Sequence, residues 1–147
     1  MKPGVTREMI MEALFTKLQT AGVAFKHYSR RMKLWGEVAD ELKPSMIMTE
    51  RPEGWVRTGE QNPGKTTLEV LLFIYIVDGK DPDATPIIRM NNLLDVVDTV
   101  LAPPPLEQNQ TLGGLVSHCW IEGEIYKEPG DLDGDGIAIV PIKILVP

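Results

Sequence analysis

The spacing of apolar residues along the chain predicts two amphipathic helices. In residues 6–21 the apolar positions recur at helical spacing, with Thr6 as an N-cap and Gly22 as a stop. Residues 87–102 give the clearer helix, which the three prolines at 103–105 terminate. The expected buried stripe of this second helix consists of Ile87, Met90, Leu94, Val97 and Leu101.

Alternation of apolar and polar residues predicts the strands. Residues 66–77 also allow helical spacing, but their β-branched and aromatic content favours a strand, whose buried face would be Leu68, Val70, Leu72, Ile74 and Ile76. Residues 115–126 and 137–146 alternate as well and are expected to form a long hairpin around the loop 127–136. Since Pro141 cannot donate a ladder hydrogen bond, we expect its strand to lie at a sheet edge or to carry a bulge there.

Shorter elements complete the predicted fold. Strands are expected at 23–31 and 45–50, a helical turn at 34–43, and a Gly/Pro-rich loop over 51–65. The order helix, two short strands, long strand, helix, hairpin predicts an α+β fold: a mostly antiparallel mixed β-sheet with two main helices packed on one face. At 147 residues and 43% hydrophobic content, the chain is expected to form a single domain, residues 1–147, with a core that requires no metal or disulfide.

Charge is distributed unevenly along the chain. The net charge is −6, yet residues 1–36 contain seven Lys/Arg against two Glu, while the remainder contains eight basic against nineteen acidic residues. Such polarity suits a subunit whose opposite surfaces meet different partners. Charged residues every few positions near the start argue against a signal peptide or a membrane span. The single Cys119 is expected to be a core residue, in a chain suited to a reducing cytoplasm.

Two motifs imitate ligand-binding loops. "GEQNPGKT" (59–66) matches the phosphate loop of nucleotide hydrolases, but that loop needs a helix starting at its lysine, and here a strand is expected. "DLDGDG" (131–136) matches the start of an EF-hand loop, but the twelfth position is Ile142 instead of glutamate. We therefore expect no cofactor and no dedicated metal site; the second stretch is interpreted as an acidic hairpin tip, with weak cation binding left open.

Three groups of residues are candidates for a protein interface. Arg30, Arg31 and Trp35 lie in "KHYSRRMKLW" (26–35), where basic and aromatic residues mix, a pattern that nucleic-acid surfaces also use. Trp120, Glu122 and Tyr126 would share a second sheet face, either a subunit interface or an ordinary exposed face. Asp131, Asp133 and Asp135 would supply an acidic patch complementary to the basic one. His27 and His118 have no partner pattern that indicates catalysis, so no catalytic residue is expected.

Several segments of the chain form a recognisable set: Phe25, SRR (29–31) and Trp35, TLE (67–69) leading to Tyr75, LLDVV (93–97), QTLGGLV (110–116), WIEGEI (120–125) and IVPIKILVP (139–147). In these segments the chain resembles the tail terminator (tail completion, minor tail protein U-like) proteins of long-tailed bacteriophages. The chain departs from the family pattern at "SMIM" after Pro44 and at the helix entry "PDATPIIR".

The resemblance implies a structural virion protein and no enzymatic activity. Such proteins form a hexameric ring on the head-proximal end of the tail tube, stop its polymerisation, and offer a surface to the head connector. The implied partners are further copies of the chain, the tail tube protein and a neck protein. Genomic DNA would pass through the lumen without sequence-specific binding, and no membrane is implied as a partner. The implied location is the virion tail, assembled in the host cytoplasm. Another neck component, or a nucleic-acid-binding accessory protein, remains the alternative.

Overall fold

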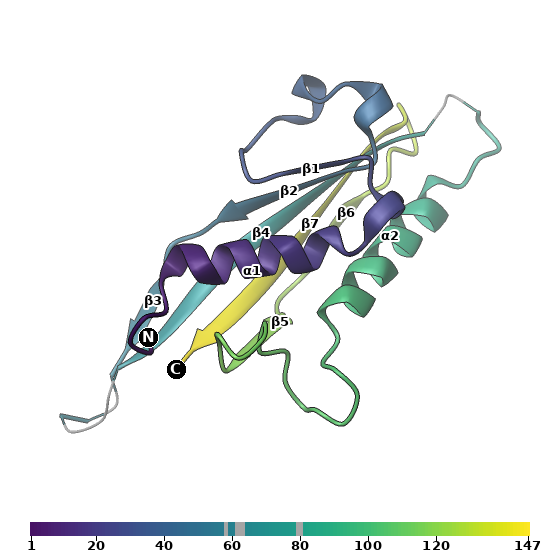
Figure 1. Cartoon of the computed structure of the whole chain (residues 1–147). Helices are drawn as coiled ribbons and strands as arrows, with labels where there is room; N and C mark the ends of the chain where they lie inside the picture. Colours follow the sequence, from purple (N-terminus) through teal and green to yellow (C-terminus); the bar gives the residue numbers. More distant parts are fainter. Residues whose placement is uncertain (58, 61–63, 79–80) are drawn as a thin grey trace.

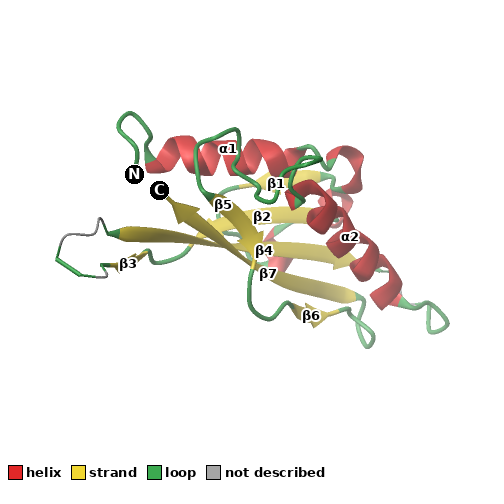
Figure 2. Cartoon of the chain, turned by 90° about the horizontal axis from the view of Figure 1, so that it is seen from below, coloured by secondary structure: helices red, strands yellow, loops and turns green. Residues whose placement is uncertain are grey.

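A computed structural model describes residues 1–57, 59–60, 64–78 and 81–147 of the chain. Within these residues, two α-helices lie on one face of a seven-stranded sheet (Figure 1, Figure 2). The strand order is β1-β2-β4-β7-β5, with β3 beside β4 and β6 beside β7. Only the pairing of β1 with β2 is parallel. The predicted α+β class, with a mostly antiparallel mixed sheet covered by helices on one side, is confirmed.

The start of the first helix and both ends of the second follow from the sequence, whereas the first helix ends at Gln19, three residues before the expected stop at Gly22. The Thr6 hydroxyl accepts a hydrogen bond from the Met9 amide at 3.1 Å, which caps α1 (Arg7–Gln19) as predicted. In α2 (Pro86–Leu101), Pro86 occupies the first turn, where its missing N–H has no cost, and the prolines after Ala102 prevent extension. The residues that face the sheet are Ile10, Met11, Leu14 and Leu18 of α1 and Met90, Leu93, Val97 and Leu101 of α2.

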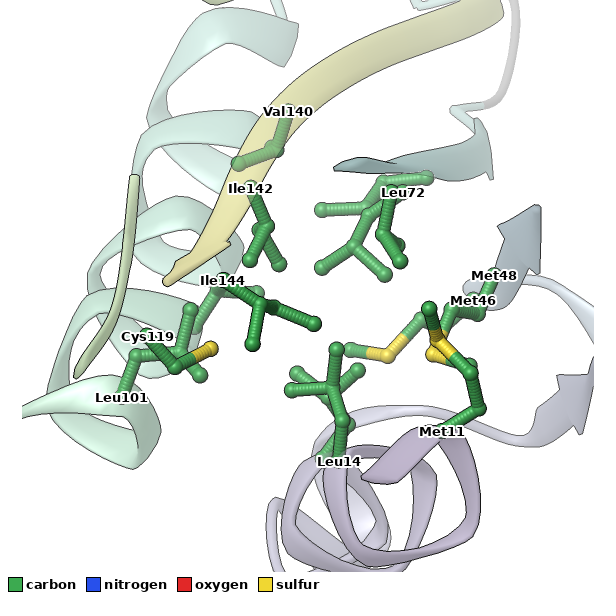
Figure 3. Packing of buried hydrophobic residues seen from close by; sticks show 14 of the residues in the cluster. Met11, Leu14, Met46, Met48, Leu72, Leu101, Cys119, Val140, Ile142 and Ile144 are labelled. Atoms are coloured by element: carbon green, nitrogen blue, oxygen red, sulfur yellow. The ribbon is translucent and has the colours of Figure 1, made fainter. Parts of the chain in front are cut away.

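The long strands β4 (Lys65–Val77) and β7 (Asp135–Val146) form the centre of the sheet. They pair antiparallel from Thr66 opposite Val146 to Val77 opposite Asp135. Their helix-facing residues are all buried: Leu68, Val70, Leu72, Ile74 and Ile76 of β4, as predicted, and Ala138, Val140, Ile142, Ile144 and Val146 of β7. Figure 3 shows side chains from β7, α1 and β2 meeting in this core.

Three of the shorter predicted elements need correction or refinement. Of the strand expected at 23–31, only β1 (His27–Ser29) forms, because Gly22–Ala24 makes a 3-10 turn that leaves Val23 fully exposed. The loop expected at 51–65 contains β3 (Gly54–Val56), which pairs with the start of β4. The strand β2 (Ser45–Glu50) is confirmed, and the helical turn at 34–43 consists of two 3-10 turns, Trp35–Glu37 and Asp40–Leu42.

The expected long hairpin is interrupted. Residues 115–126 do not form one strand: β5 (His118–Ile121) and β6 (Tyr126–Glu128) both pair with β7, and the residues between them leave the ladder. Of the two alternatives predicted at Pro141, an edge strand or a bulge, the edge strand is wrong, since β7 has neighbours on both sides. The Pro141 carbonyl accepts from the Glu122 amide at 3.2 Å, so the side of Pro141 that lacks a donor faces the gap between β5 and β6. The interruption therefore lies in the neighbouring strand.

The phosphate-loop pattern is followed by a strand, as expected. Residues 61–63 of this pattern lie outside the described residues. Lys65 and Thr66, where a phosphate-binding loop would start its helix, are the first two residues of β4. A helix N-terminus that would attract phosphate is therefore absent at this position.

Candidate interaction surface

The face of the sheet away from the helices is largely uncovered and carries several apolar residues beside the ion pair of Glu69 and Lys143. Neither α1 nor α2 lies on it (Figure 2). Its half-buried residues run across the two central strands as Leu71 and Phe73 of β4 and Ile139, Pro141 and Leu145 of β7. We call these five residues the apolar strip. Leu71 stands opposite Pro141 and Phe73 opposite Ile139, so these four residues are contiguous, whereas the ion pair of Glu69 and Lys143 separates them from Leu145.

One end of this face is covered by the 3-10 turns. Val38 packs with Ile47 and Tyr75 in a second small cluster, and Trp35 lies against it. The Trp35 indole donates to the Ile76 carbonyl at 3.1 Å, and the Lys43 ammonium lies 3.2 Å from the centre of a Trp35 ring. Trp35, which the sequence suggested for an interface, thus stabilises the fold of its own chain.

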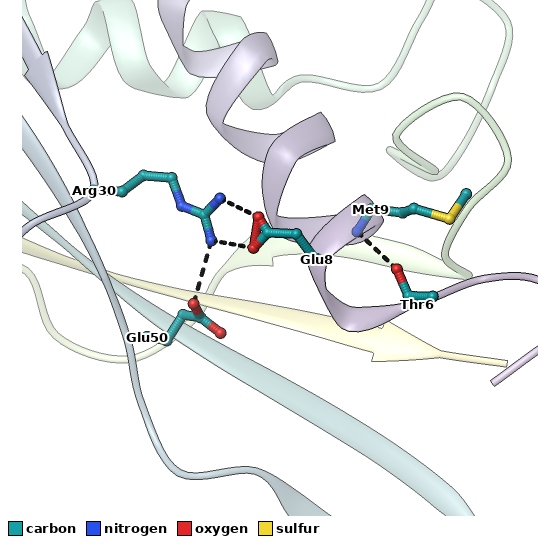
Figure 4. Close-up of polar contacts among 5 residues, drawn as sticks. All are labelled: Thr6, Glu8, Met9, Arg30 and Glu50. Carbon is teal, nitrogen blue, oxygen red and sulfur yellow. Dashed lines mark hydrogen bonds and ion pairs between the residues drawn. The ribbon is translucent and has the colours of Figure 1, made fainter.

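Arg30 makes internal ion pairs instead of a free basic patch. Its guanidinium donates to both carboxylate oxygens of Glu8, at 2.6 and 2.8 Å, and to Glu50 at 3.3 Å (Figure 4). These contacts join α1 to β2, and the hydrogen bond from Arg30 lowers the pKa of the Glu8 carboxyl. Arg31 next to it is exposed, and its side chain has no hydrogen bond or ion pair within the described part of the chain.

Trp120, Glu122 and Tyr126 line the β5–β6 side of the sheet. The Trp120 ring stacks on His118, with centroids 4.9 Å apart and planes at 11°. Nδ1 of His118 accepts from the Gln110 amide at 3.1 Å, which fixes the orientation of the imidazole. Glu122 pairs with Lys143 at 2.6 Å, and this hydrogen bond lowers the pKa of the Glu122 carboxyl. Tyr126 stands opposite Ile139 and is exposed.

The acidic residues at 131–135 lie in the turn that leads into β7. Asp131 and Asp133 are exposed, and the Asp133 carboxylate accepts from the amide of Asp135 at 2.9 Å, which closes the turn. A hollow of about 660 Å³ separates this turn from residues 81–86. Across the described residues, no group of three His, Cys, Asp or Glu side chains is arranged to hold a metal ion.

A second hollow, of about 510 Å³, lies beside β5. Asp98 of α2 lines it together with His118 and Trp120. The base of the loop 102–110 closes one side of it, and Gln110 holds that base through a hydrogen bond to the Ala102 carbonyl at 2.9 Å. Asp98 was not predicted, and Gln110 was named only within the segment 110–116 of the family resemblance, because only tertiary packing brings these residues to β5.

The predicted site residues therefore fall into separate regions. Trp120, Glu122 and Tyr126 lie toward the β5–β6 edge, whereas Arg30 and Arg31 follow β1 at the other edge of the sheet. The acidic turn lies at the start of β7, beyond Val77 of β4.

Comparison with known proteins adds no identification. The sequence matches no model of a known protein family, and no curated protein is significantly similar to it. In the described part of the chain, neither helix is long and apolar enough to cross a membrane.

Proposed function

We propose that this chain is a structural subunit of a phage tail, a tail terminator that forms a ring on the head-proximal end of the tail tube. In this role it ends tube polymerisation and offers a surface to the neck protein that joins head and tail. The proposal assigns no catalytic step and no cofactor to the chain. It rests on the family resemblance together with the surface properties of the folded chain.

The apolar strip is the observation that carries the proposal. A sheet face that holds leucine, phenylalanine, isoleucine and proline at half burial is typical of a subunit that packs against other subunits. The accessible surface also favours an assembly: it is 8678 Å² for 16.4 kDa. Compact monomers of this mass expose about 7500 Å².

The surroundings of the histidines and of Arg30 argue against the other function classes. Among the described residues, His27 lies beside Lys33 and His118 accepts from a backbone amide, so neither histidine hydrogen-bonds to a nucleophile. The basic stretch that suggested nucleic-acid binding loses its central charge, because Glu8 and Glu50 neutralise Arg30. Phosphate binding at this position would have to break both ion pairs.

Electron microscopy with the tail tube protein of the same phage tests the proposal. We expect ring-shaped particles of the chain, and tubes that carry a ring at one end and stop growing. Tubes that elongate equally with and without the chain would overturn the proposal. A salt-dependent shift of DNA without any effect on tubes would favour the nucleic-acid-binding alternative.

A further inference from the structure

The two edges of the sheet carry opposite charge. The segment around β1, residues 22–34, contains four basic residues and no acidic one: Lys26, Arg30, Arg31 and Lys33. The β5–β6 edge, with the adjoining turn of α2, carries Asp98, Glu124 and Glu128 against Lys127, and also Glu122, which Lys143 neutralises. Because β1 and β5 end the strand order, these two groups lie on opposite flanks of the molecule.

On the acidic flank, the hollow beside β5 has the chemistry of an arginine site. Asp98 is exposed, and its side chain makes no hydrogen bond or ion pair to another described residue. Trp120 presents a half-buried indole that is already stacked on His118. A guanidinium that enters this hollow meets the Asp98 carboxylate from α2, and Trp120 of β5 lines the same hollow.

On the basic flank, Arg31 is the side chain suited to this site. It is exposed and unpaired within the described residues, unlike Arg30, whose charge is neutralised by Glu8 and Glu50. Exposed apolar residues follow it: Met32 is 43% and Leu34 64% exposed. An arginine beside apolar surface is the composition found at the centre of protein interfaces.

We propose that Arg31 of one copy binds in the hollow formed by Asp98 and Trp120 of the next copy. This inference rests on the proposed function and names the subunit contact of its ring. The contact uses different surfaces on the two copies, so it is heterologous and repeats head to tail until a ring closes. The hollow is preformed, because Gln110 fixes both the loop 102–110 and the His118 ring on which Trp120 stacks. Preformed sites lose less entropy on binding.

Charge reversal at the two positions tests the contact. We expect Arg31→Glu and Asp98→Arg each to raise the subunit dissociation constant at least about tenfold, as desolvated charge pairs do. The double variant restores an opposite-charge pair in every contact and should recover most of the association. Arg31→Lys keeps the charge but loses the planar guanidinium, so an intermediate effect is expected. Sedimentation velocity measures all four proteins, and thermal melting checks that these exposed substitutions leave the fold intact.

Matched controls and a second readout make the outcomes distinct. Lys65→Glu and Asp83→Arg change the charge equally at exposed positions away from both edges and should associate like the parent chain. If the chain associates only on tube ends, no dissociation constant can be measured in free solution. The fraction of tubes that carry a ring is then measured for every variant instead. Rings or capped tubes that form equally in the parent chain and both single reversals overturn this contact and leave the proposed function standing. A parent chain that neither associates nor caps tubes overturns both.

Discussion

Gln110 is a buried polar residue whose hydrogen-bonding groups all have partners. Its side chain donates to the Ala102 carbonyl at 2.9 Å and accepts from the Leu112 amide at 3.2 Å, while its carbonyl accepts from the Cys119 amide. Gln110→Ala leaves buried groups unpaired and should lower the free energy of unfolding by about 2 kcal/mol. Urea denaturation measures this. The exposed neighbour variant Gln108→Ala should cost about 0.5 kcal/mol or less, and equal losses would contradict the role of Gln110.

Cys119 gives a pH-dependent prediction. Burial raises the pKa of its thiol from 9.0 to about 12, because the charged thiolate is poorly solvated in the core. The thiol stays protonated in the folded chain at pH values where the unfolded chain ionises. Its contribution to stability is therefore complete below pH 9 and is lost as the pH rises toward about 12. A thiol-specific reagent at pH 8 should label Cys119 only when denaturant is added; rapid labelling of the folded chain would refute the burial.

At the scale of elements, the turn before β7 depends on Gly130. Its φ is +86°, and a Cβ at this position would lie 2.8 Å from the Asp135 nitrogen and the Gly134 carbonyl carbon. Gly130→Ala must therefore shift the backbone, and we expect it to lower the free energy of unfolding by about 3 kcal/mol. Gly113 has φ +75° but open space around its missing Cβ, so Gly113→Ala should cost about 1 kcal/mol. Chemical denaturation of both variants measures the difference. Equal losses in the free energy of unfolding would show that the close contact of the added Cβ does not destabilise the Gly130→Ala variant.

The elements also show what local sequence can predict. β7 and both helices followed from periodicity, since each of them buries one continuous face, whereas β4 needed its β-branched and aromatic content to distinguish a strand from a helix. The break between β5 and β6 did not, because the alternation of residues 115–126 continues through Gly123, where φ is +103°. The partners of Arg30 were equally hidden, since Glu8 and Glu50 lie 22 and 20 residues away in sequence. Trp120, Glu122 and Tyr126 were predicted to share a face, but Asp98 joins Trp120 only through the packing of α2 beside β5.

At the scale of the whole molecule, the excess of basic residues near the start of the chain becomes a difference between two sheet edges. Contacts between such edges weaken as salt screens them: the Debye length falls from about 10 Å at 0.1 M to about 3 Å at 1 M salt. We therefore expect subunit association, followed by light scattering, to decrease over this range. The apolar strip predicts the opposite trend, because salts that are excluded from apolar surface strengthen its burial. Association that increases with sulfate and is unaffected by sodium chloride would move the subunit contact from the charged edges to the open face of the sheet. The two surfaces are distinct, so the sign of the salt effect identifies which of them holds neighbouring copies together.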